Sequence, residues 1–405
     1  MNSRERVRMV LDKRIPDKVP CGLGGCETAG LHLQAYDKLQ EVLKVPRTKP
    51  RLDTFMMNAV FEMDVIEALG ADIVLLASPR MCRSRFRGPG NEGEWKEQAL
   101  WGRTFRVPVS EIFTNNPDGS MIWETAGKTT CLPGGMFFNH IPSESEAGLK
   151  LDYEIPSPKT YNPAHELPER TLMDLEEAAR ELFLNTDKSI CCGETITDLQ
   201  IGPCGFTGTM MLMMERPELM HEYLDKSVSS ALSQLKQLDQ VIGKYADMLS
   251  IAHDFGDNRN VMIGAPLWRE IYKPHYKRLF TEWKKITRMK INFHSCGAIS
   301  EILPDLVECG VDVLNPVQTS ADNMDAPTLK NKFGDDLVFF GGAYDAQSIP
   351  ANLSYEEVYV TVKRNCEIFK KGGGFIFAGV HNLPGDIPEH HIEAMLEAFN
   401  ESKNY

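Results

Sequence analysis

The sequence predicts an α/β protein with a (β/α)8 TIM barrel, and three observations favour this fold. Short apolar runs typical of buried strands recur along the chain, helical patterns separate them, and polar side chains follow nearly every run. Eight strands that alternate with helices are the pattern of this barrel. An open doubly wound sheet is the alternative, but Gly22-Leu23-Gly24-Gly25 is a poor match to its glycine-rich first turn. The expected strands lie at residues 18–23, 71–77, 189–193, 247–253, 290–295, 311–317, 337–343 and 374–380.

Helices are expected wherever apolar residues recur with helical spacing between capping and stopping residues. The first covers residues 3–11, and a second is predicted over 53–69, between a cap at Asp53 and a stop at Gly70. The later helices are expected at 172–184, 217–243, 266–287, 298–309, 327–333, 354–370 and 388–401.

Residues from about 80 to 165 interrupt the alternation of strands and helices. This stretch contains short β-like pieces rich in aromatic residues, separated by turn signals such as Asn116-Pro117-Asp118-Gly119. We therefore expect one barrel domain spanning 1–405, with a β-rich insertion after the second strand. The insertion is predicted to lie beside the mouth of the barrel and to contact substrate or a partner.

Composition limits the classes of partner. The net charge of −13 disfavours nucleic acid and anionic membrane surfaces. No apolar run approaches the ~20 residues of a membrane span, and the first residues lack the pattern of a signal peptide. Ten cysteines without a CxxC pair indicate reduced thiols rather than a disulfide framework. We expect a cytoplasmic protein with no nucleic-acid or membrane partner, and a homodimer is left open.

The strongest local signal for chemistry is His294-Ser295-Cys296-Gly297, at the end of the fifth expected strand. Residues i and i+2 of an extended segment point the same way, so His294 and Cys296 could bind one Zn²⁺ ion and leave a position open for substrate. A buried histidine beside a small apolar cysteine is the alternative. Because the carboxyl ends of barrel strands meet at one face, other polar residues there become candidates too.

These candidates fall into two groups. His253 and Asp254 could supply an oriented imidazole and a general base. Residues that follow other strands are candidates for contacts with substrate: Arg80, Asn315, Gln318, Tyr344 and Asn382.

Three strings of the sequence resemble the uroporphyrinogen decarboxylase superfamily. They are SRERVRMVLDKRIPDKVP at the start, HSCGAISEILPDLVECGVDVLNPVQ in the centre and GGGFIFAGVHNLPGDIP near the end. The resemblance implies a barrel over essentially the whole chain except the insertion. It also implies one of two activities, haem-pathway decarboxylation or zinc-dependent methyl transfer linked to a cobamide.

Departures from the decarboxylase pattern favour the methyltransferase branch. The arginine-rich motif of the decarboxylases is replaced by residues 21–26, and Ser78 stands where they carry a key aspartate, although His381 matches their late histidine. In the methyltransferases a later cysteine completes the His-x-Cys zinc site. Here the matching segment carries His381 instead, so His381 or Glu194 is the expected third ligand.

The resemblance therefore implies a zinc-dependent methyltransferase with a small-molecule methyl donor or acceptor. No corrinoid-binding string of the Asp-x-His-x-x-Gly kind is present, so the corrinoid is expected on a separate partner protein. A metal-free decarboxylase using His253, Asp254 and His381 is the alternative, and a non-catalytic tetrapyrrole binder is a third.

Overall fold

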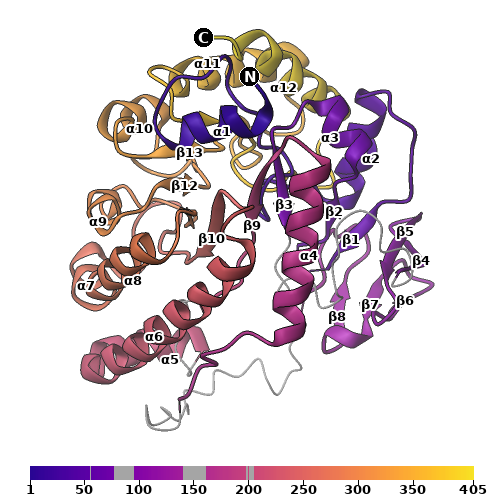
Figure 1. Ribbon diagram of the computed structural model, residues 1–405. Helices are drawn as coiled ribbons and strands as arrows, with labels where there is room; N and C mark the ends of the chain where they lie inside the picture. The colour runs from indigo at the N-terminus through magenta and orange to yellow at the C-terminus, as the bar shows by residue number, and fades with distance from the viewer. Residues whose placement is uncertain (55, 77–94, 140–160, 198, 200–204) are drawn as a thin grey trace.

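The computed structural model describes residues 1–405 except 55, 77–94, 140–160, 198 and 200–204. Seven parallel strands form a curled sheet of the TIM-barrel type, in the order β14-β13-β12-β11-β10-β9-β3 (Figure 1). Most of their residues are buried because helices cover the sheet, as expected for short apolar runs. The strands are β3 (Ile73–Leu76), β9 (Ser189–Cys192), β10 (Met248–Ala252), β11 (Lys290–His294), β12 (Val313–Asn315), β13 (Val338–Phe340) and β14 (Phe375–Ile376).

The first of the eight expected strands is instead a short extended segment between the two edge strands. On one side, Phe377 donates its N–H to the carbonyl of Pro20 at 2.9 Å, and Gly22 donates to the carbonyl of Phe377 at 2.8 Å. On the other side, Asp72 donates its N–H to the carbonyl of Cys21, while its side chain accepts the Cys21 N–H. The side chain of Asp72 thus takes the place of a backbone carbonyl in one hydrogen bond between the strands. The prediction of eight regular strands is therefore wrong for the first strand.

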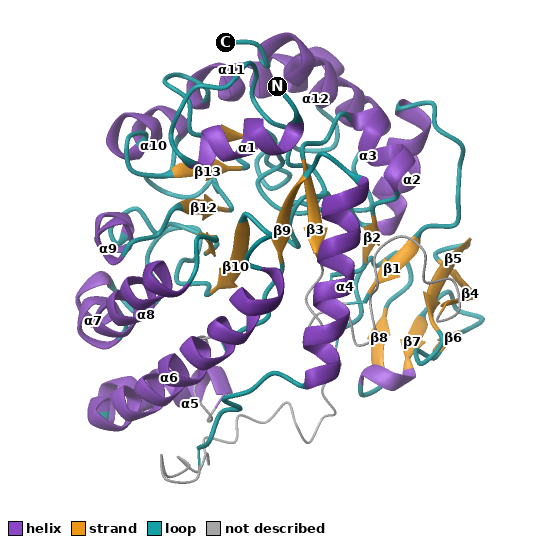
Figure 2. Ribbon diagram, in the orientation of Figure 1, coloured by secondary structure: helices purple, strands orange, loops and turns teal. Residues whose placement is uncertain are grey.

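Helices follow the strands and lie on the outer side of the sheet (Figure 2). Their buried faces carry the apolar positions that predicted them; α8, for example, buries Tyr276, Phe280 and Trp283. The helices are α1 (Ser3–Leu11), α2 (Leu33–Val42), α3 (Met63–Leu69), α4 (Glu169–Asn185), α5 (Gly205–Glu215), α6 (Pro217–Ile242), α7 (Ala265–Ile271), α8 (Lys273–Ile286), α9 (Leu303–Cys309), α10 (Ala326–Phe333), α11 (Tyr355–Phe369) and α12 (Glu389–Ser402).

Helix α1 is tied to the amino-terminal ends of the strands. Arg6 pairs with Asp72, directly before β3, at 2.6 Å. Arg8 pairs with Asp247, directly before β10, at 2.8 Å. Structural ion pairs therefore stabilise this end of the barrel. The functional site is expected at the opposite end, where the carboxyl ends of the strands lie.

Two small sheets lie outside the barrel sheet: β6-β7-β8 belongs to the insertion, and β2-β1-β5-β4 joins strands β4 and β5 of the insertion to β1 and β2, which precede β3. The β character of the insertion is as predicted for 95–131, whereas 80–94 and 140–160 lie outside the described residues. The helix expected over 53–69 is wrong in its first half, because β1 and β2 occupy that region and pair with each other and with β5. The strands are β1 (Arg51–Asp53), β2 (Asn58–Val60), β4 (Trp95–Leu100), β5 (Arg103–Pro108), β6 (Phe113–Asn115), β7 (Met121–Trp123) and β8 (Thr129–Cys131).

Candidate metal centre

The end of β11 brings the two residues of the His-x-Cys motif together. Gly297 has a φ of 88°, and a Cβ there would lie 2.3 Å from the backbone of Gly256, so the sharp turn requires glycine. The turn leaves Cys296 Sγ 3.4 Å from His294 Nε2. Both side chains face the carboxyl end of the sheet, as the spacing predicted.

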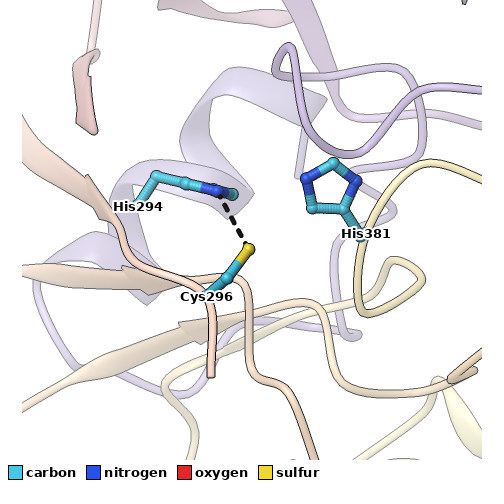
Figure 3. Close-up of side chains that lie close together, drawn as sticks. All are labelled: His294, Cys296 and His381. Atoms are coloured by element: carbon cyan, nitrogen blue, oxygen red, sulfur yellow. Dashed lines mark hydrogen bonds between the residues drawn. The ribbon is translucent and has the colours of Figure 1, made fainter. Parts of the chain in front are cut away.

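His381 completes a group of three residues that could hold a metal ion (Figure 3). It follows β14, and its ring lies 5.5 Å from that of His294, at 74° to it. One possible ligand atom from each of His294, Cys296 and His381 lies within 4.8 Å of the others. This is the one such group within the described ranges, and Glu194 is outside it.

Asn315, at the end of β12, sets the tautomer of His294. Its Nδ2 donates to the carbonyl of Phe340 at 3.1 Å, which fixes the orientation of the amide because that carbonyl can only accept. Its Oδ1 accepts from the Thr28 hydroxyl at 2.6 Å and faces His294 Nδ1 at 2.8 Å. The proton must therefore be on Nδ1, so the lone pair of Nε2 is directed towards Cys296.

Burial and one nearby carboxylate control the charges of the group. Burial, with a further contribution from Asp254, raises the pKa of the Cys296 thiol. Burial also lowers the pKa of His294, and burial together with His294 lowers that of His381 to about 4. The protein alone thus holds two neutral imidazoles, which can bind a cation, and a thiol that would lose its proton on binding one.

Asp254 and Gln318 accept hydrogen bonds from the backbone of the His-x-Cys motif. Asp254 Oδ1 accepts the backbone N–H of Cys296 at 2.9 Å and lies 3.6 Å from His294 Nε2. Gln318 Oε1 accepts the N–H of Gly297 at 2.8 Å. Both side chains, predicted as a general base and a substrate contact, hold the turn in place.

His253 is separated from the group, although its backbone N–H donates to the carbonyl of His294. Its Nδ1 lies 3.0 Å from the Tyr276 hydroxyl, and its ring packs on Phe255 with centroids 3.8 Å apart. Burial lowers the pKa of His253 to about 3, so its imidazole is neutral at physiological pH. In this structure Asp254 is positioned against Cys296 rather than against its neighbour His253.

The other predicted substrate contacts are engaged in structural hydrogen bonds. Tyr344 donates its hydroxyl proton to His391 Nδ1 on α12, because the other ring nitrogen of His391 faces the carbonyl of Leu353. Asn382 Oδ1 accepts the N–H of Gly30 at 2.7 Å. Arg80 lies outside the described residues.

Sequence reasoning missed Glu27 and Thr28, which follow the first extended segment. Thr28 bonds Asn315, and the carboxyl of Glu27 accepts the backbone N–H of Glu194 at 2.7 Å. Both residues follow an expected strand, so the rule that polar residues after strands collect at one face identifies them.

Comparison with known proteins agrees with the architecture. Residues 201–402, about half of the chain, match the family model for uroporphyrinogen decarboxylase (URO-D). The chain belongs to the uroporphyrinogen decarboxylase family. A comparison with curated proteins gives no match.

Solved structures are similar to this chain at low sequence identity. A methyltransferase from Methanosarcina mazei aligns with a TM-score of 0.55 and 13% identity over 99% of both chains, which shows a common fold along the full length. A GH113 β-1,4-mannanase has a TM-score of 0.29 and 9% identity over 54% of this chain and 70% of its own. A glycoside hydrolase family 5 enzyme from Prevotella bryantii B14 has a TM-score of 0.33 and 11% identity over 58% of this chain and 78% of its own. The last two scores are too low to support an argument.

Across the portion of the chain that the structure describes, no helix has both the length and the apolar character needed to cross a membrane.

Proposed function

We propose that this protein is a zinc-dependent methyltransferase that moves a methyl group between a small substrate and a corrinoid carried by a separate protein. The observation that carries the proposal is the group of His294, Cys296 and His381 at the carboxyl end of the sheet. Family membership and the fold shared with a methyltransferase support it.

The residues fit a zinc ion. Bond lengths of about 2.05 Å to nitrogen and 2.3 Å to sulfur at a tetrahedral angle put two ligand atoms about 3.6 Å apart. His294 Nε2 and Cys296 Sγ are 3.4 Å apart. His381 would be the third ligand, and three protein ligands leave the open position typical of a catalytic rather than a structural site.

When bound, zinc would lower the pKa of a coordinated thiol or polarise a methoxy or amine group of the substrate. The protein's own residues prepare the site for that chemistry. Asn315 keeps the Nε2 lone pair of His294 available, and Gln318 and Asp254 hold the turn that carries Cys296. Burial keeps His381 neutral, so no imidazolium repels an incoming cation.

The test compares Cys296→Ser with Cys309→Ser, a control on α9 whose buried thiol faces the carbonyl of Lys273. We expect wild type and control to hold about one zinc per chain, and Cys296→Ser to bind zinc at least about 10-fold more weakly. Turnover that depends on methylcobalamin should fall with it, whereas thermal unfolding should barely change. Elemental analysis measures the zinc content per chain, and a chelator competition titration measures the zinc affinity.

Well under one zinc per wild-type chain after zinc supplementation would contradict the proposal. In that case the protein is incubated with uroporphyrinogen and the products are separated by chromatography. Decarboxylated porphyrinogens would support the metal-free carboxy-lyase alternative, while their absence would leave the non-catalytic tetrapyrrole binder.

A further inference from the structure

A second polar cluster lies inside the barrel, one layer below the candidate metal centre. On β11, Phe293 packs against Tyr276 and Phe280 of α8, so its side chain faces outwards. The residues on either side, Asn292 and His294, therefore face the interior. They are separated along the strand by about 6.6 Å.

Asn292, Ser250 and Glu27 form this inner cluster. Asn292 Nδ2 donates to Ser250 Oγ, on the adjacent strand β10, at 3.0 Å. The Ser250 hydroxyl also lies against the carboxyl of Glu27 and stabilises its ionised form, so it donates its single proton there. All three residues are buried, with exposed fractions of 1%, 4% and 5% for Asn292, Ser250 and Glu27.

The cluster has more hydrogen-bond acceptors than donors. Asn292 uses its amide nitrogen for Ser250, and its Oδ1 has no hydrogen-bond partner in the protein. Buried carbonyl oxygens of this kind are nearly always bonded, because an unmatched one costs about 1–3 kcal/mol. The free acceptor therefore indicates a ligand that carries donors.

The carboxyl of Glu27 also has no cation beside it. None of the ion pairs among the described residues involves Glu27, and the charge of another acid, Asp53, raises its pKa further. Burial raises the pKa of Glu27 to about 7, and a positive charge beside the carboxyl would favour its ionised form. Buried carboxylates are stable when a cation or several donors accompany them.

We propose that the inner cluster binds the ammonium group of a small substrate, with Glu27 and Asn292 Oδ1 as its acceptors. Glu27 already accepts the backbone N–H of Glu194, but Asn292 Oδ1 has no donor and Glu27 forms no ion pair among the described residues. An ammonium group supplies both missing features, because it carries three N–H donors and one positive charge. This inference names the substrate class of the proposed methyltransferase and rests on that function. The binding of an amine itself does not require the metal.

The distance between the inner cluster and the candidate metal centre limits the length of the substrate. With the nitrogen held at the level of Asn292, an atom about five bonds away reaches the level of His294, about 6.6 Å along the strand. The substrate class is thus a short amine with a thiol, thioether or ether group at that distance, such as an aminoalkyl thiol.

The experiment measures whether the zinc-loaded protein distinguishes 4-aminobutane-1-thiol from 1-pentanethiol, which replaces the ammonium by a methyl group. We expect the amine to bind at least about 10-fold more tightly, the value of one charge-assisted hydrogen bond. Glu27→Gln should abolish this preference. Glu111→Gln is the matched control, because Glu111 is also a buried carboxyl but bonds Trp123 and Thr125 in the insertion.

Asn292→Leu provides a second variant in case Glu27→Gln does not fold. It removes the free acceptor at nearly constant volume and should reduce the preference several-fold. Calorimetry measures the dissociation constants, and thermal unfolding verifies that each variant is folded. Equal affinity of the wild type for both probes, or an unchanged preference in both folded variants, would overturn the proposal.

A metal-free arm separates this proposal from the proposed function. Ligand-observed NMR follows binding of 1-propylamine to protein stripped of metal, for wild type and Glu27→Gln. Binding that depends on Glu27 in a protein unable to hold zinc would support the ammonium site and refute the zinc methyltransferase. Zinc binding without any preference for the amine would refute the ammonium site and leave the zinc methyltransferase proposal standing.

Discussion

Replacing Asn315 by leucine should weaken metal binding and destabilise the protein together. The substitution preserves volume but removes the acceptor for His294 Nδ1–H and the donor to the carbonyl of Phe340. Two buried polar groups lose their partners, at about 1–3 kcal/mol each, so the free energy of unfolding should fall by about 2–6 kcal/mol. Loss of the partner that orients a metal-binding histidine lowers affinity by about 10- to 100-fold, which is about 1.4–2.7 kcal/mol.

The aspartate variant at the same position separates the two effects. Asn315→Asp keeps an acceptor for His294 and Thr28 but places a second oxygen against the carbonyl of Phe340. Its zinc affinity should equal or exceed that of the wild type, while its stability should still fall. Zinc affinity is measured by competition with a chromophoric chelator, and stability by urea unfolding. A leucine variant that binds zinc as tightly as the wild type would refute the role assigned to Asn315.

Two further predictions concern stability. Arg6→Met leaves the buried carboxylate of Asp72 without its cation and should lower the free energy of unfolding by about 3–5 kcal/mol; a loss under about 1 kcal/mol in urea titrations would be inconsistent with this. His32 accepts the N–H of Gln34 at the start of α2 and faces the carbonyl of Met136 in the insertion, and burial lowers its pKa to about 4. His32 in the unfolded chain takes up a proton near pH 6.5, so it should not change the pH dependence of stability above that pH. It should reduce stability as the pH falls from about 6.5 to 4, because the unfolded chain then binds more protons. His32→Gln should show a shallower loss over this range in unfolding curves recorded at several pH values, and an identical slope would contradict the assignment.

Local patterns were sufficient to predict much of the barrel. The runs that became β9, β10 and β11 were predicted within one or two residues, because a strand covered on both faces is rich in apolar residues. The spacing of His294 and Cys296 likewise implied a shared direction, since side chains in extended backbone alternate with a period of two.

Errors arose where pairing partners are distant in the sequence. The segment from 53 to 60 has the periodicity of a helix, yet β1 pairs with β5, about 50 residues later, and this pairing overrides local propensity. In the first extended segment, the Cys21 N–H bonds the side chain of Asp72 instead of a backbone carbonyl of the neighbouring strand. Hydrophobic periodicity does not reveal such competition between side chain and backbone.

The sequence by itself determined the alternation of buried strands and helices and the joint orientation of His294 and Cys296, because both depend on backbone periodicity over a few residues. Only the tertiary structure decided that His381 joins them, that Asn315 fixes the tautomer and that Glu27 lies beneath the centre without a cation. These residues come from four separate loops or strand ends, 27 to 381 along the chain. Their proximity follows from the curling of the parallel sheet, which brings the carboxyl ends of distant strands to one face.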